Sequence, residues 1–225
     1  MSGRKSHHRT GMFAATVLAG ILSGAFILSA RDMVQGPDLP DEPFQRGLAL
    51  FKLFRFEEAK ASFDAAIEKA PGRKEAFYHR GRTLLKLDRL NAAKGDFNRA
   101  LKIDPDYAEG YIGRALEAIQ RKRYNAAWEM NEKAAALSPE HPEVFYQKGL
   151  IFGYTDKAAE AVPAFERCVE LQPDHAYAHY QLGTAYYEQK RPDLTIVHLT
   201  RFLELAPQAP EAPQVRNLLE FIRRR

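Results

Sequence analysis

The sequence predicts an all-α fold in which five helix–turn–helix repeats stack into a superhelical solenoid, with a capping helix behind them and one transmembrane helix in front. Three observations predict it. A proline recurs every 34 residues, small residues recur at fixed places within each interval, and apolar residues follow the helical period. A unit of that length holds two short helices and a turn, and it cannot bury its apolar face unless neighbouring units stack on it.

The repeats span residues 41–207 and are marked by prolines and small residues. The prolines are Pro71, Pro105, Pro139, Pro173 and Pro207. The small residues of the first helices are Gly47, Gly81, Ala115, Gly149 and Gly183. Those of the second helices are Ala59, Ala93, Ala127 and Ala161, with Thr195 as the exception. Small side chains let two helices approach closely, so the helices of each pair are expected to cross at these positions.

Aromatic residues fill the space between the small ones. The second helices close with Phe63, Phe97 and Phe165, and Asn131 and Leu199 take that place in the third and fifth units. The prolines, small residues and aromatic residues recur in register over about three quarters of the chain. In this they resemble the tetratricopeptide repeat. The fifth unit, residues 176–207, is the plainest, because it carries the Leu182-Gly183 and Tyr186-Tyr187 pairs that the family favours. The resemblance implies a right-handed superhelix whose first helices line a concave wall, and it implies binding of partner proteins rather than catalysis.

The helical period gives each first helix one face that packs and one that faces this concave groove. The side chains expected to line the groove are Phe44, Phe51, Tyr78, His79, Arg82, Ile112, Tyr146, Gln147, Tyr154, Tyr177, Tyr180, Gln181 and Tyr187. Such a groove is aromatic and sparsely charged, which suits a partner peptide or helix with apolar anchors. The alternative is that several of these aromatic side chains pack between adjacent first helices.

Composition and charge exclude some functions. The chain is 45% hydrophobic and 28% charged, which is typical of a folded domain. Its 33 basic and 29 acidic residues are scattered, so no concentrated basic face for nucleic acid is expected. The lysines and asparagines with which members of the family grip acidic chaperone tails are missing at the matching positions. Acidic tails are therefore poor candidate ligands.

No set of residues predicts catalysis, a metal site or a cofactor. His175 and His179 have the four-residue spacing of a helical metal pair, but Pro173 and Asp174 place His175 in the turn before the helix. Cys168 stands where sister units have alanine, and it is expected to be a buried spacer rather than a nucleophile.

The front of the chain predicts a membrane anchor. Residues 11–30 contain no charged residue, and twenty residues of helix reach about 30 Å, the hydrocarbon thickness of a bilayer. Residues 1–10 form a basic tail and residues 31–40 a short linker, so the positive-inside rule places the tail in the cytoplasm and the repeats on the periplasmic or exported side. Small residues four apart, Gly20 and Gly24 among them, could join two such helices as a homodimer.

Two alternatives stay open for this segment. A basic start, an apolar middle and small residues near Ser29-Ala30 also fit a cleaved signal peptide, which would leave a secreted periplasmic protein. The basic, acid-free first thirty residues also fit a mitochondrial presequence.

Two details concern the end of the array. Pro163 falls inside the second helix of the fourth unit, where a late helix start or a slight kink is expected. Residues 208–225 carry Val215, Leu218, Leu219 and Ile222 on one side, the pattern of an amphipathic helix that caps the last repeat.

Together these patterns predict a single-pass, membrane-anchored adaptor that recruits or orders other envelope proteins. One alternative is a structural scaffold that associates with itself. Another is a cytosolic or mitochondrial protein of reversed topology. The likeness to anchored repeat arrays of bacterial envelopes concerns the fold alone.

Overall fold

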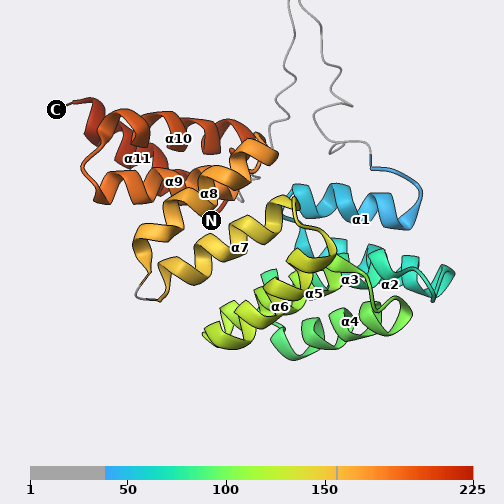
Figure 1. The fold of residues 1–225 in the computed structure, drawn as a ribbon. Helices are drawn as coiled ribbons and strands as arrows, with labels where there is room; N and C mark the ends of the chain where they lie inside the picture. Colours follow the sequence, from blue (N-terminus) through green and yellow to red (C-terminus); the bar gives the residue numbers. More distant parts are fainter. Residues whose placement is uncertain (1–38, 156, 225) are drawn as a thin grey trace, which may run out of the picture. The chain divides into compact units, whose positions relative to one another are not determined.

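The computed structural model describes residues 39–155 and 157–224, and this part of the chain contains eleven helices and no strand. The helices are α1 (Pro43–Lys52), α2 (Phe56–Lys69), α3 (Lys74–Lys86), α4 (Leu90–Ile103), α5 (Ala108–Gln120), α6 (Tyr124–Leu137), α7 (Pro142–Gly153), α8 (Ala158–Leu171), α9 (Ala176–Glu188), α10 (Pro192–Leu205) and α11 (Ala212–Arg223) (Figure 1). The predicted all-α array of five helix pairs and a final helix is confirmed.

The predicted tail, anchor and homodimer contact, and nearly all of the predicted linker, fall on residues 1–38, outside the described residues. Among the helices that the structure describes, none combines the length and the apolar character needed to cross a membrane.

The small residues of the first helices face the closing side chain of the second helix, so the helices of a pair approach closely at these positions. A Cβ atom at Gly81 would lie 2.5 Å from Cε1 of Phe97, and one at Gly149 would lie 2.5 Å from Cε1 of Phe165. No real Cβ approaches that closely, so only glycine fits. In the third unit the closing side chain is the smaller Asn131, and alanine takes the glycine position as Ala115.

The turns inside four of the five helix pairs share a backbone feature that the sequence does not mark. Phe54, Asp88, Lys122 and Lys190 have positive φ, at 59°, 57°, 59° and 59° respectively. In each case the next residue donates its N–H to a carbonyl in the last turn of the helix, as from Arg89 to the carbonyl of Leu84 at 2.8 Å. This is the Schellman termination of a helix, which usually places glycine at the left-handed position.

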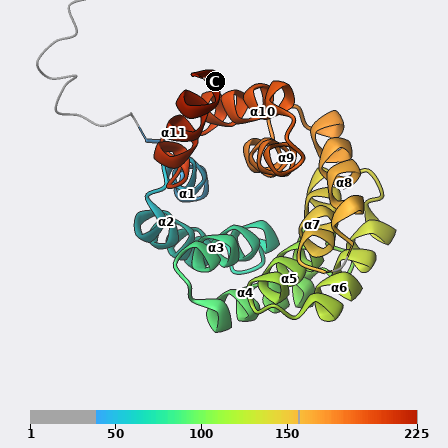
Figure 2. The ribbon, with the colours of Figure 1, turned by 90° about the vertical axis from the view of Figure 1, so that its left-hand side faces the viewer.

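Within residues 39–224 the helices form two layers. Figure 2 shows the odd-numbered helices α1 to α9 on the inner side of a ring and the even-numbered helices on its outer side. Contacts of the first two repeats with the last one show that the array completes about one turn: Phe54 of the first repeat packs against the buried cluster of α10 and α11, and the Lys86 ammonium of the second lies 4.8 Å from the ring centre of Tyr177. The inner surface is therefore surrounded by protein on most sides.

Of the two outcomes expected at Pro163, the late helix start is wrong, and the slight kink stays a prediction. Helix α8 begins at Ala158, in register with α6 at Tyr124 and α10 at Pro192, and it contains Pro163. The helix keeps the register of its sister repeats through Pro163, and packing with Phe165 buried in the core outweighs the backbone hydrogen bond that Pro163 cannot donate.

Other expectations about packing are confirmed. Cys168 is fully buried. In α11, Val215 and Leu219 are buried against α10, so this helix caps the last repeat as expected.

Candidate protein-binding surface

The inner helices bring the predicted groove residues to one side of the array but expose them very unequally. Tyr154 and Tyr187 are exposed, at 57% and 44%. The residues with intermediate exposure are Phe51, His79, Arg82, Tyr146, Tyr177, Tyr180 and Gln181. The buried ones are Phe44, Tyr78, Ile112 and Gln147.

The four buried residues pack against neighbouring repeats, which for the aromatic Phe44 and Tyr78 is what the alternative predicted. The Gln147 side-chain amide donates to the backbone carbonyl of Ile112 at 2.8 Å and so joins α7 to α5. Phe44 meets Phe63 edge to face at 5.8 Å and carries the Arg73 guanidinium 3.7 Å above its ring centre. These side chains leave little surface for a partner to contact.

A smaller set of tyrosines remains available on α7 and α9. Tyr180 packs at 5.1 Å against Phe202 of α10, and the Tyr177 hydroxyl donates to Glu211 Oε2 at 3.2 Å. Tyr154 stacks on Tyr124 at 5.6 Å with the rings 18° apart, which holds an exposed ring in a fixed position. This part of the inner surface therefore presents aromatic rings that are already positioned.

The inner surface also carries charges of both signs. Arg82 of α3 lies over the rings of Phe51 and Tyr78, at 5.3 and 5.6 Å from their centres. Burial opposes ionisation of Glu143 on α7, but a hydrogen bond from His175 and the positive charge of Arg82 outweigh it and lower the pKa of Glu143 to about 2. Lys86 of α3 is in contact with solvent, but it lies on the inner side of the superhelix with protein around it. This surrounding protein lowers the pKa of its ammonium group.

Sequence reasoning missed Glu143 and Glu211 as part of this surface. The signal was present, because Glu75, Glu109 and Glu143 are spaced by 34 residues and Glu211 follows two intervals later. Each lies at or just before the first turn of a helix, where a negative charge interacts favourably with the helix dipole.

His79 is a predicted groove residue that the structure uses in packing. Its ring stacks on Phe63 at 5.8 Å with the planes 20° apart and meets Phe44 edge to face. Burial, together with the charge of Arg82, lowers the pKa of this imidazole to about 3.

We expect this imidazole to make stability depend on pH. The unfolded chain takes up a proton on His79 near the ordinary histidine pKa of 6.5, whereas the folded chain does so only near 3, so stability is full above 6.5 and falls as the pH decreases below it. One such group contributes a slope of up to about 1.4 kcal/mol per pH unit. Urea unfolding between pH 7 and pH 5 should therefore show a smaller loss for His79→Phe than for the wild type. Equal losses of stability in the variant and the wild type would contradict the lowered pKa of His79.

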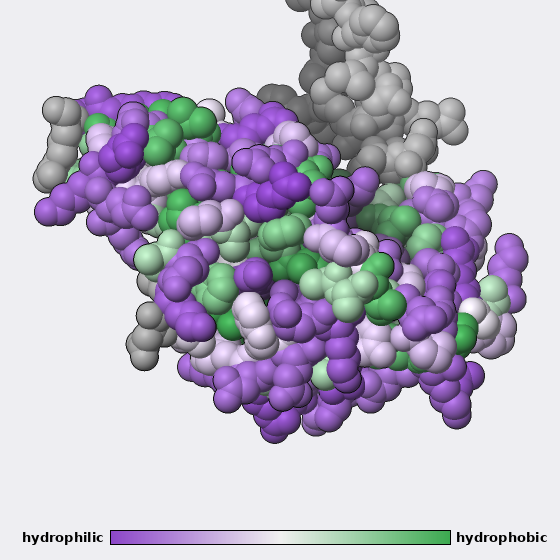
Figure 3. Space-filling model, viewed as in Figure 1, coloured by the Kyte–Doolittle hydropathy of each residue, from purple (hydrophilic) through white to green (hydrophobic). Residues whose placement is uncertain are grey.

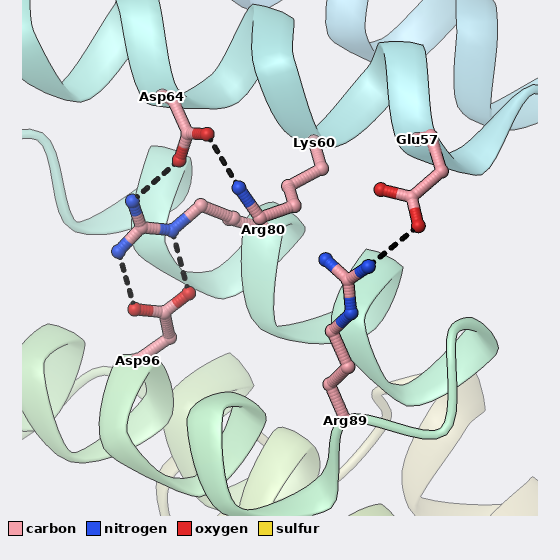
Figure 4. Close-up of polar contacts among 6 residues, drawn as sticks. All are labelled: Glu57, Lys60, Asp64, Arg80, Arg89 and Asp96. Carbon is pink, nitrogen blue, oxygen red and sulfur yellow. Dashed lines mark hydrogen bonds and ion pairs between the residues drawn. The ribbon is translucent and has the colours of Figure 1, made fainter.

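A hollow lies between α7 and α8, with a volume of about 400 Å³. Phe145, Phe152 and Pro163 line it, and Lys148 and Ala164 stand at the positions that Arg80 and Asp96 occupy in the second repeat. There the two side chains form an ion pair (Figure 4). Figure 3 shows hydrophobic residues gathered over the middle of one face, around α7, with hydrophilic ones around them.

His175 and His179, whose spacing resembles that of a helical metal pair, make separate contacts in the structure. His175 caps α9, its Nδ1 accepting the N–H of Ala178 at 3.0 Å, while His179 bonds to a different residue, His198. Within the part of the chain that the structure describes, no group of three or more histidine, cysteine or carboxylate side chains could hold a metal ion.

Helix pairs stacked in register, with aromatic and charged side chains on the inner helices, define a helical-repeat scaffold, a class whose members bind other proteins or peptides. A family model of the tetratricopeptide repeat matches residues 44–108 and 146–210, together more than half of the chain, and the chain belongs to the tetratricopeptide repeat family. Comparison with curated proteins finds no match.

Several solved structures share the fold. TTC0263, a thermophilic protein of this family from Thermus thermophilus, is 22% identical with a TM-score of 0.67, over 80% of this chain and 96% of that one. A repeat protein from Parabacteroides merdae is 16% identical with a TM-score of 0.67, over 80% of this chain and 69% of that one. PilF of Pseudomonas aeruginosa is 20% identical with a TM-score of 0.56, over 81% and 87%. At these identities the likeness concerns the fold alone.

Proposed function

We propose that this chain is a membrane-anchored adaptor that binds a segment of a partner protein on the inner surface of its repeats, in the assembly of an envelope complex. One observation carries the proposal: the inner helices α7 and α9 present several tyrosines with exposed or half-exposed rings, held in place by stacking and hydrogen bonds. Tyrosine gives a large contact area at low entropic cost and a hydroxyl that orients the partner.

The charges on the inner surface limit what the partner can be. Arg82 and Lys86 lie on the same surface as Glu143 and Glu211, and the pKa of Lys86 responds to both carboxylates. A strongly acidic or strongly basic segment would meet like charge at one of these groups. The surface therefore favours a peptide or helix that binds through apolar side chains.

The anchor rests on the sequence. Residues 11–30 carry no charge, and basic residues stand in front of them. We infer that this segment holds the protein in a membrane, with the amino terminus in the cytoplasm, the repeats on the exported side and a homodimer contact through Gly20 and Gly24. Protease added to spheroplasts should then cleave the repeats. Full protection of the repeats would mean that they lie on the cytoplasmic side, opposite to the proposed topology.

Replacing Tyr154 and Tyr187 by serine is expected to remove the partner without unfolding the array, because both rings are exposed. Aromatic residues at the centre of an interface often contribute about 2 kcal/mol each, so the affinity should fall by roughly thirtyfold if one of the two rings contributes and by roughly a thousandfold if both do. The measurement is capture of the full-length protein from its native membranes, with the co-purified proteins identified and quantified by mass spectrometry.

The matched control replaces two hydrophobic side chains of outer helices by serine, Leu137 and Val197, which are exposed at 41% and 60%. Circular dichroism must show unchanged helix content for both variants. Partners lost from the tyrosine variant and kept by the control support the inner surface. The same partners at the same yield on both variants would place binding on another surface.

A further inference from the structure

Two histidines of the last repeat face each other across its helix pair. His179 lies in α9 and His198 in α10, and their Nδ1 atoms are 3.0 Å apart. The two rings are tilted by 33° with centres 5.2 Å apart. Nineteen residues separate the two positions in the sequence, a spacing that predicts nothing by itself.

The surroundings of His179 fix which nitrogen carries its proton. Its Nε2 lies 3.1 Å from the backbone carbonyl of Pro173, a contact that only an N–H can make. The neutral ring therefore has its lone pair on Nδ1, directed at His198. A backbone carbonyl that accepts the far N–H is the arrangement that orients histidine ligands in metal sites.

His198 is held in place from its other side. Its ring stacks on Tyr186 at 5.6 Å and 23°, and the Tyr186 hydroxyl donates to Glu166 Oε1 at 2.6 Å. Burial lowers the pKa of both imidazoles, so both are neutral and able to bind a metal near pH 7. Both side chains keep intermediate exposure, which leaves access from solvent.

The separation of the two nitrogens fits one shared cation. Two imidazole nitrogens at about 2.0–2.1 Å from one zinc ion are about 2.9 Å apart at a right angle and about 3.4 Å apart in a tetrahedron. The observed 3.0 Å lies in this range. In the metal-free chain the same distance is filled by a hydrogen bond from His198 Nδ1 to His179 Nδ1, and His198 would move its proton to Nε2 when the metal binds.

We propose that His179 and His198 form a two-imidazole site for a divalent cation of the zinc class, a site independent of the inner surface. Imidazole ligands suit zinc, copper and nickel. The remaining coordination positions are open to water or to a side chain of another molecule, since the described residues supply no third ligand to a cluster here. The bound ion would join α9 to α10 in the repeat that precedes the capping helix.

The test is titration of the full-length chain in detergent with Zn²⁺ alone, followed by calorimetry. His7 and His8 could bind the metal themselves, so all proteins carry His7→Gln and His8→Gln. We expect one ion per chain, and at least about tenfold weaker binding for His179→Gln and for His198→Gln, because even loss of an outer-sphere partner costs about 10–100-fold. His141→Asn, at a helix cap elsewhere, should leave binding unchanged.

A second measurement avoids substitutions at the site. In the protein with ¹⁵N-labelled histidine, Zn²⁺ should shift the imidazole signals of His179 and His198 together at one equivalent. It should also raise the melting temperature of this protein and not that of the His179→Gln variant. Absence of binding, or binding that survives both glutamine substitutions, would overturn the site and leave the nitrogen pair as a hydrogen bond only.

Discussion

Alanine at Gly81 is expected to lower the free energy of unfolding by about 1–3 kcal/mol, the usual cost of overpacking a close-packed core. The same substitution at Gly95 is expected to raise it by about 0.5–1 kcal/mol. Both glycines lie inside helices of the second unit, α3 and α4. A Cβ at Gly81 would lie 2.5 Å from Cε1 of Phe97, whereas one at Gly95 would have no neighbour within 4 Å.

The opposite signs follow from how Phe97 is confined. Its ring is fully buried, and its atoms Cδ1 and Cε1 lie close both to Gly81 of its own repeat and to Gly113 of the next, where a Cβ would lie closer still. A ring enclosed in this way has little room to shift when a Cβ is added at Gly81. The gain of about 1 kcal/mol from replacing a helical glycine is therefore outweighed at Gly81 and fully realised at Gly95.

The measurement is urea unfolding of the two variants beside the wild type, followed by circular dichroism, with hydrogen exchange to show which helices open. In a stacked array each repeat is stabilised by its neighbours, so the loss at Gly81 should appear first in α3 to α5. A stabilising effect at Gly81 would mean that the Phe97 ring has room to move, contrary to its packing.

The sequence was sufficient to predict the architecture because the 34-residue period determines where each helix lies and which helices pack together. Once the prolines set the register, Gly81 and Phe97 had to meet, and Ala115 had to pair with Asn131. The left-handed residues of the turns could not be predicted in this way. Positions such as Phe54 hold no glycine, and the stacked repeats impose the turn on whatever residue stands there.

The candidate surface was predicted less well than the fold. The helical period identifies the inner side of a helix, but exposure there depends on the residue that the next repeat places opposite. Gln147 is buried because its amide reaches the Ile112 carbonyl of the neighbouring repeat, whereas Tyr154, at the end of the same helix, stays exposed. The His179 and His198 pair was missed for the same reason, since only the packing of two helices brings them together.

Arg80→Met is expected to destabilise the array by about 3 kcal/mol, the usual cost of leaving a buried charge unpaired. Arg80 of α3 lies between two carboxylates from neighbouring helices, with Nη1 at 2.7 Å from Asp64 and Nη2 at 2.6 Å from Asp96 (Figure 4). The Asp96 side chain is only 9% exposed, and Arg80 supplies both hydrogen bonds that it accepts from described residues. Asp64 would keep Lys60 at 2.7 Å as a second partner.

The neighbouring pair in Figure 4 provides a control of the same chemistry. Arg89 bonds Glu57 at 2.7 Å, but the two side chains are 47% and 61% exposed. Exposed pairs contribute about 0–1 kcal/mol, so Arg89→Met should be close to neutral. If both substitutions cost the same in urea unfolding, burial of Asp96 is not what makes Arg80 important.

The double variant Arg80→Met, Asp96→Leu separates the charge from the packing. If the cost of Arg80→Met comes from the carboxylate left unpaired, then removing that carboxylate should restore most of the lost stability, because apolar side chains of similar volume can replace a buried ion pair. The fourth repeat already holds Lys148 and Ala164 at these positions and still folds as a helix pair, with a hollow in place of the ion pair. Losses that simply add in the double variant would mean that the cost of Arg80→Met does not come from leaving Asp96 unpaired.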